Sequence, residues 1–140
     1  MNKPLYEVTV PMRYGDMDTN GHINNVAHFR FFEEGRVQWL ASLNVKADGS
    51  GVGPVVAETS ANFKKELHYP GVLVVRAFVK RIGNSSYTLQ QQLVLAHSPD
   101  QVVTEGTCTI VWFNHNTKQS TPLPEKLIAI LSDHVVAIDN

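Results

Sequence analysis

Apolar and polar residues alternate near the start of the chain and then change to a helical period. Apolar side chains stand at every second position from Tyr6 to Met12, which is typical of a half-buried strand. Residues 14–25 are dense in Asp, Asn and Gly and predict a loop. From residue 26 to about 43 the spacing predicts the longest helix. Its expected apolar stripe is Val26, Phe29, Phe32, Val37 and Leu40, and its expected outward residues are Arg30, Glu34 and Gln38.

The rest of the chain is composed mainly of strand patterns separated by turn residues. A Gly-rich connector at residues 44–54 precedes predicted strands at residues 55–69, 72–82, 86–97 and 102–113, and a short helix follows Pro124. Short turns such as Pro70-Gly71 join antiparallel strands. The single long helix must bury its apolar stripe against the one available sheet. The pattern therefore predicts an α+β fold, in which an antiparallel sheet wraps around a central helix.

The length and composition of the chain favour a single globular domain and argue against several classes of protein. The 140 residues are enough for one domain, which we expect to span residues 1–140. With 12 basic and 13 acidic residues the net charge is -1, which argues against a nucleic-acid-binding protein. Residues 1–11 hold no continuous apolar run, so we expect neither a signal peptide nor a membrane span. The single cysteine, Cys108, cannot form an internal disulfide, which favours the cytoplasm.

The chemically richest segment is the loop before the long helix. It combines Asp16, Asp18 and His22 with several asparagines. The start of a helix offers unpaired backbone amides and a partial positive charge, both suited to a developing oxyanion. A carboxylate beside such amides can attack a carbonyl or activate water. Thioesters are a suitable target because a thiolate leaves without a strong acid, so we expect no metal and no cofactor.

Two other interpretations of this loop are open. Residues 16–21 resemble the start of a calcium loop, but its twelfth position would be Ala27, where a glutamate is needed. An Asx-rich turn that only caps the helix fits the spacing as well as a catalytic loop does. In that turn Asn24 or Asn25 would be the N-cap, and Asp16 would hold the loop, for instance by pairing with Arg13.

The segment DTNGHINN at residues 18–25 resembles the signature of the hotdog-fold thioesterases. These comprise the 4-hydroxybenzoyl-CoA thioesterase type and the plant acyl-ACP thioesterases, whose motif is Asp-x-Asn-x-His-Val-Asn-Asn. The similarity continues through FRFFEEGR at residues 29–36, FKKE at 63–66 with Pro-Gly at 70–71, and RIGNSSY at 81–87. It therefore covers most of the chain and implies a hotdog fold.

The resemblance also implies roles for particular residues. Asp18 matches the catalytic carboxylate, acting as nucleophile or as general base. Asn25 stands where a backbone amide at the helix start polarises the thioester carbonyl. Asn20, His22 and Glu66 match residues with catalytic or positioning roles in the plant enzymes. The turn with Lys80, Arg81, Asn84 and Ser85 corresponds to a region that often contacts coenzyme A phosphates, although as a bare charge cluster it would equally fit a solvated turn.

Other reactive side chains have structural interpretations. Glu33 and Glu34 would pair with Arg30 or Arg36 on the helix, although a second hotdog branch uses a helical carboxylate. Cys108 would pack as a small apolar residue within a strand. The motif at residues 83–86 lacks the second glycine of a nucleophile elbow. The remaining histidines, His28, His68, His97, His115 and His134, show no metal-ligand spacing.

The resemblance implies hydrolysis of an acyl-CoA or acyl-carrier-protein thioester, a role in fatty acid metabolism, and a homodimer or homotetramer that buries the acyl group between subunits. Two alternatives stay open at this point. One is a hotdog hydratase or dehydratase acting on acyl thioesters, whose Gly-Asp-x-Asn-Pro-x-His motif is matched poorly because the proline is absent. The other is a non-catalytic acyl-CoA-binding protein.

Overall fold

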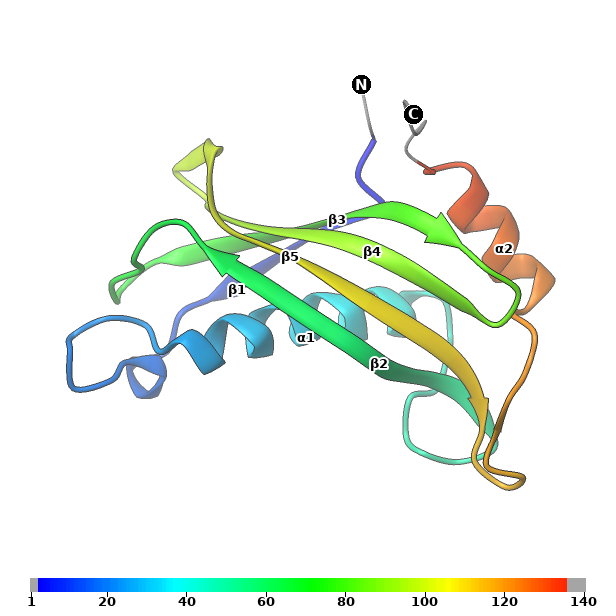
Figure 1. The fold of residues 1–140 in the computed structure, drawn as a ribbon. Helices are drawn as coiled ribbons and strands as arrows, with labels where there is room; N and C mark the ends of the chain where they lie inside the picture. Colours follow the sequence, from blue (N-terminus) through cyan, green and yellow to red (C-terminus); the bar gives the residue numbers. More distant parts are fainter. Residues whose placement is uncertain (1–2, 136–140) are drawn as a thin grey trace.

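A computed structural model of the protein describes residues 3–135. Its elements are β1 (Tyr6–Pro11), a one-turn 3-10 helix (Tyr14–Asp16), α1 (Asn25–Ser42), β2 (Val52–Phe63), β3 (Val72–Ile82), β4 (Ser86–Leu95), β5 (Ser98–Asn114), β6 (Gln119–Ser120) and α2 (Glu125–Ser132). The sheet curves over the long helix α1, as Figure 1 shows. The predicted α+β architecture is confirmed.

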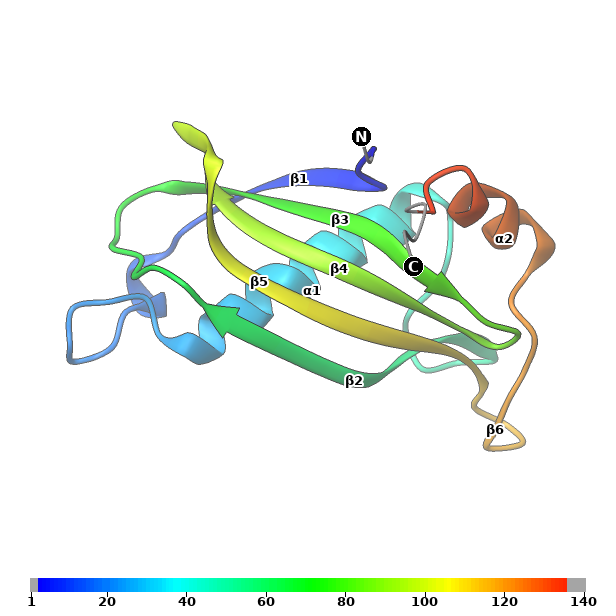
Figure 2. The ribbon, with the colours of Figure 1, turned by 45° about the horizontal axis from the view of Figure 1, so that its top comes forward.

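The strands form one antiparallel sheet in the order β1-β3-β4-β5-β2, with β6 paired to the end of β5. Strand β2 therefore pairs with β5 and not with β3, its neighbour along the chain. The turn at Pro70-Gly71 does not join paired strands, contrary to what a short turn would indicate. Residues 64–71 instead run from one edge strand of the sheet to the start of β3, next to the opposite edge strand β1 (Figure 2).

The strand boundaries follow the predicted pattern closely in the middle of the sheet. Strand β3 has the predicted bounds because its buried and half-buried residues alternate regularly. The prediction for residues 55–69 is wrong after Phe63, since the chain leaves the edge of the sheet there and the amides of residues 64 and 65 both donate to the Val103 carbonyl. Strand β5 begins at Ser98, earlier than predicted, because a register shift between Val94 and Leu95 accommodates the residues around Pro99.

The long helix packs its buried face on the sheet through large side chains and one glycine. Phe32 is fully buried, and Trp39 stacks on Tyr6 of β1 with ring centroids 5.5 Å apart. At Gly35 the helix backbone comes so close to the sheet that a Cβ there would lie 2.8 Å from Val75 Cγ1. A glycine at this position therefore permits the close approach of helix and sheet.

The buried face of α1 is rotated relative to the predicted stripe. Phe32 and Leu40 are buried as expected, but Val26 is 66% exposed and Val37 is 48% exposed. The buried residues of the helix are Ala27, His28, Phe31, Phe32, Gly35, Trp39 and Leu40. The predicted outward residues Arg30, Glu34 and Gln38 are exposed. The predicted apolar stripe differs from the buried face because Val26 and Val37 fit the helical period as well as the buried residues do.

Candidate active site

The loop between β1 and α1 is built around the buried Asp16 carboxylate. Its Oδ2 accepts the Arg13 amide at 2.8 Å, and its Oδ1 accepts the Arg13 guanidinium at 3.2 Å. The Asp16 carbonyl in turn accepts the Asn24 amide at 2.9 Å, which closes the loop at the start of the helix. The predicted role of Asp16 in holding the loop is confirmed.

The first turn of α1 offers an unpaired amide. Asn24 is the N-cap, and its side-chain oxygen accepts the Val26 amide at 2.8 Å, so the first of the two predicted caps is correct. Its carbonyl accepts the Ala27 amide. Within residues 3–135 the Asn25 amide has no hydrogen-bond partner. An exposed N–H at a helix start is suited to bind the oxygen of a polarised carbonyl.

Asp18 lies at the base of a tight turn within the same loop. Its amide donates to the His22 carbonyl at 2.9 Å, and its Oδ1 accepts the Asn20 amide at 2.9 Å. Gly21 completes the turn with a φ of 77°, a conformation that glycine adopts without steric cost. Among the residues that the structure describes, the second carboxylate oxygen accepts no hydrogen bond, so it is available to a substrate or to water.

The segment after β2 reaches the same loop and brings Glu66 to His22. The Ile23 amide donates to the Leu67 carbonyl at 2.7 Å, and both side chains are buried. Beside this anchor, His22 Nε2 lies 3.1 Å from Glu66 Oε2. The structure thus links the predicted residues Asp18, Asn20, His22 and Glu66 through direct contacts, and Asn25 follows them as the first residue of α1. His22 is paired with Glu66 and not with the Asp18 carboxylate.

His68 is a member of this group that the sequence did not single out. Its Nε2 lies 3.7 Å from Glu66 Oε2, and its ring is perpendicular to that of His22, with centroids 4.9 Å apart. The signal that could have found it is its position two residues after Glu66. In an extended segment, residues at this spacing point to the same side.

The predicted coenzyme A residues lie at the other end of the sheet. Lys80 and Arg81 line an open hollow on the face away from α1, together with Glu58, Thr88, Thr107 and Thr109. Asn84 and Ser85 occupy the β3–β4 turn, and their carbonyls accept the amides of Leu123 and Trp112. Because β3 has 11 residues, this end is about 35 Å from the Asp18 loop. Figure 2 shows the two loops at opposite ends.

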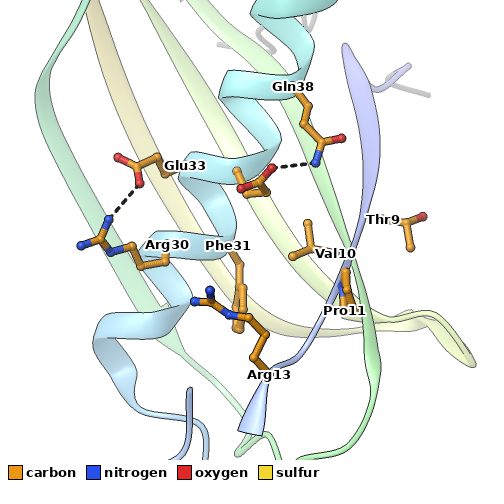
Figure 3. A pocket seen from close by; sticks show the side chains of 9 residues that line it. Thr9, Val10, Pro11, Arg13, Arg30, Phe31, Glu33 and Gln38 are labelled. Atoms are coloured by element: carbon orange, nitrogen blue, oxygen red, sulfur yellow. Dashed lines mark hydrogen bonds and ion pairs between the residues drawn. The ribbon is translucent and has the colours of Figure 1, made fainter. Parts of the chain in front are cut away.

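Hollows lie on both sides of α1. One, of about 370 Å³, lies between the helix and β1; charged and polar side chains such as Arg13, Arg30 and Glu33 line it together with Val10, Pro11 and Phe31 (Figure 3). The second, about 260 Å³, lies between the helix and β2, beside the first turn of α1. Its lining combines the apolar residues Val26, Phe29 and Val56 with Arg30, Glu33, Arg36 and Thr59. The second hollow therefore suits an apolar group whose polar end lies at the helix start.

The helical glutamates and Cys108 have contacts that indicate structural roles. Arg30 lies 3.4 Å from Glu33, and Gln38 donates to Glu34 at 2.8 Å, so both helical glutamates have partners on their own helix (Figure 3). Cys108 is buried in β5, where burial raises the pKa of its thiol. A thiol that stays protonated is a poor nucleophile. Its predicted role as a packed strand residue is confirmed.

Comparison with known proteins places the chain in a family. Residues 12–131 match the model of the thioesterase-like superfamily. The chain belongs to this superfamily. The resemblance inferred from the motifs is thereby confirmed, and so is the hotdog fold, since a Pseudomonas aeruginosa protein proposed to be a thioesterase superimposes with a TM-score of 0.88 at 35% identity, over 91% of this chain and 98% of that one.

Further similar proteins extend this picture. A proposed acyl-CoA thioesterase from Xanthomonas campestris is 31% identical over 86% of this superfamily member and 100% of that chain, with a TM-score of 0.77. A 1,4-dihydroxy-2-naphthoyl-CoA thioesterase from Synechocystis has a TM-score of 0.82 at 15% identity, over 91% of this chain and 96% of that one, which shows the shared fold alone. The Bacillus subtilis protein YsmA is 30% identical over 80 residues, 57% of this chain and 54% of YsmA, so the match spans about half of that relative.

No helix within residues 3–135 has the length and apolar character that crossing a membrane requires.

Proposed function

We propose that this chain hydrolyses an acyl thioester of coenzyme A or of an acyl-carrier protein, with Asp18 as the catalytic carboxylate. The observation that carries the proposal is a pair of complementary groups that have no hydrogen-bond partner among the residues the structure describes, the second Asp18 carboxylate oxygen and the Asn25 amide at the start of α1. The first supplies a nucleophile or a base, and the second binds the developing oxyanion. Membership of the thioesterase-like superfamily supports the same reaction.

The reaction follows from these two groups. The Asp18 carboxylate attacks the thioester carbonyl carbon, or removes a proton from a water molecule that attacks it. The negative charge that develops on the carbonyl oxygen is stabilised by the Asn25 N–H. The carbon–sulfur bond then breaks and the thiolate leaves, taking up a proton from solvent. If Asp18 itself attacked, water then hydrolyses the acyl–Asp18 anhydride, which releases the acid and restores the carboxylate; if water attacked, Asp18 returns its proton to solvent. His22 and Glu66 position the loop through their 3.1 Å contact, and the Asn20 amide fixes one oxygen of Asp18.

The test is thiol release from a panel of short, long and aromatic acyl-CoAs. Asp18→Asn keeps the oxygen that accepts the Asn20 amide but removes the charge, and we expect kcat to fall by at least ~100-fold. Asp48→Asn is the matched control, because Asp48 Oδ1 accepts the Ser50 amide in an equivalent turn at 3.0 Å. Full activity in Asp18→Asn would refute the assignment. A wild type inactive on CoA and carrier-protein esters would favour the binding role, and a change in double-bond absorbance would favour the hydratase.

We further propose that a second copy of the chain completes the site. Strand β2 is an edge strand of 12 residues, and Val52, Val55, Val56 and Phe63 on it are exposed. Long apolar edges are usually covered in stable proteins. If two β2 edges pair antiparallel about a two-fold axis, the Lys80–Arg81 end of one copy comes beside the Asp18 loop of the other. That end would then contact coenzyme A phosphates, and the α1–β2 hollow would hold the acyl group.

Complementation between two defective chains tests this arrangement. Asp18→Asn and the double variant Lys80→Ala/Arg81→Ala are each expected to lose activity on acyl-CoA, the second mainly through a higher KM. An equal mixture in which subunits exchange should recover about a quarter of wild-type activity, because half the dimers hold one intact site. No recovery, with heterodimers verified by mass spectrometry, would refute a site shared between copies.

A further inference from the structure

We propose that His22, Glu66 and His68 form a binding site for one divalent transition-metal cation of the Zn²⁺ type. One ligand atom from each residue can be chosen so that all three lie within 4.8 Å of one another. Two imidazoles and one carboxylate are a donor set that such cations prefer, whereas Ca²⁺ and Mg²⁺ prefer oxygen alone. The inference does not depend on the proposed hydrolysis.

The hydrogen bond of His68 points to a ligand. Its Nδ1 lies 3.3 Å from the Gly21 carbonyl oxygen, and because a carbonyl only accepts, Nδ1 must carry the proton. In the neutral ring, Nε2 then presents a lone pair toward Glu66 Oε2, 3.7 Å away. This distance is too long for a hydrogen bond. Metal-bound histidines characteristically donate their other N–H to a backbone carbonyl, which fixes this tautomer.

The spacing of the donor atoms fits a small cation. Ligands at about 2.0–2.1 Å in a tetrahedron are separated by about 3.4 Å. The two separations from Glu66 Oε2, 3.1 Å to His22 Nε2 and 3.7 Å to His68 Nε2, lie on either side of that value. Three protein ligands leave further coordination positions to water, as expected for a cluster with two exposed residues.

The backbone prepares this arrangement. Ile23 and Leu67 are buried and joined by a 2.7 Å amide-to-carbonyl hydrogen bond, which fixes the two loops relative to each other. His22 precedes one anchor residue, and Glu66 and His68 flank the other, so all three donors project from anchored backbone. A bound cation would therefore link the loop of residues 17–24 to the segment of residues 64–71.

The experiment is a calorimetric titration of the full, tag-free chain with ZnCl₂ after treatment with EDTA, with CoCl₂ followed by visible absorption. We expect one Zn²⁺ per chain and Co²⁺ d–d bands. His68→Ala and Glu66→Gln should each weaken binding by at least ~10-fold, since loss of even an outer-shell partner of a metal ligand typically costs that much. The matched control His97→Ala, in the β4–β5 turn, should bind as wild type does. CaCl₂ should produce no heat of binding.

Absence of Zn²⁺ binding, or Zn²⁺ affinity that His68→Ala leaves unchanged, would overturn the site. Because a variant could fail to fold, imidazole ¹⁵N spectra of wild type provide a second test. Zn²⁺ should shift the Nε2 resonances of His22 and His68 and leave His97 unchanged, and the opposite pattern would also overturn the proposal. None of these measurements uses thioester hydrolysis, so an inactive protein that binds Zn²⁺ refutes only the proposed function.

Discussion

His28 is a buried histidine whose surroundings make the stability of the protein depend on pH. The side chain is 2% exposed, its Nδ1 lies 2.7 Å from Thr104 Oγ1, and its ring meets that of Phe63 edge-on at 4.9 Å. Burial lowers the pKa of His28 from 6.5 to about 4, and the Ile23 carbonyl offsets only part of this effect. The folded protein therefore keeps His28 mainly neutral above about pH 4.

The sign and size of the effect follow from this pKa. Between pH 6.5 and about 4 the unfolded chain binds a proton at His28 that the folded chain does not, so acid favours unfolding. The contribution is fully present above pH 6.5 and is lost as the pH falls toward about 4. The complete difference corresponds to about 3 kcal/mol, of which about 2 kcal/mol is lost by about pH 5.

Urea unfolding at pH 8 and pH 5 measures this contribution. His28→Gln removes the titrating group but keeps an amide that can bond to Thr104. Wild type should lose about 2 kcal/mol more free energy of unfolding than His28→Gln between these pH values. The exposed His97→Gln should follow wild type. If His28→Gln and wild type lose equal free energy, the buried neutral histidine is not the source of the acid sensitivity.

Two further substitutions test how α1 is seated and how it begins. Gly35→Ala places a Cβ 2.8 Å from Val75 Cγ1 and should lower the free energy of unfolding by about 1–3 kcal/mol, whereas Gly15→Ala, with no atom within 4 Å of its Cβ, should change it little. An equal urea midpoint for the two would show that the helix can move off the sheet. Asn24→Ala removes the acceptor of the Val26 amide and should cost about 1 kcal/mol by urea unfolding, and an unchanged midpoint would show that water replaces the cap.

The sequence predicts an element correctly where its spacing of apolar residues fits only one buried face. Strand β3 was predicted with the correct bounds because its buried face alternates without interruption from Leu73 to Val79. The phase of α1 was not, since Val26 and Val37 match the helical period yet lie on the exposed side. The helical spacing of apolar residues does not tell which of them are buried. An exposed valine and a core valine fit the same spacing.

The contacts of the candidate site likewise fall into those that the sequence predicts and those that it does not. The Asp16 anchor and the Asn24 cap were predictable because both act over three residues or fewer. The meeting of His22 with His68 was not, since it depends on a contact between segments 46 residues apart that no spacing rule encodes. The pairing of β2 with β5 was missed for the same reason, because nothing local to a strand specifies a partner that lies far along the chain.

Strand β2 connects the proposed subunit edge to the Asp18 loop. Its exposed apolar residues lie on the edge that we propose pairs with a second copy. The strand ends at Phe63, and the residues that follow it contact the Asp18 loop. The Leu67 carbonyl holds Ile23, which follows His22 and immediately precedes the helix cap. A shift of the β2 edge would therefore be transmitted through four residues of chain to the loop that carries the carboxylate. The placement of the Asp18 loop thus depends on the path that the chain takes after β2.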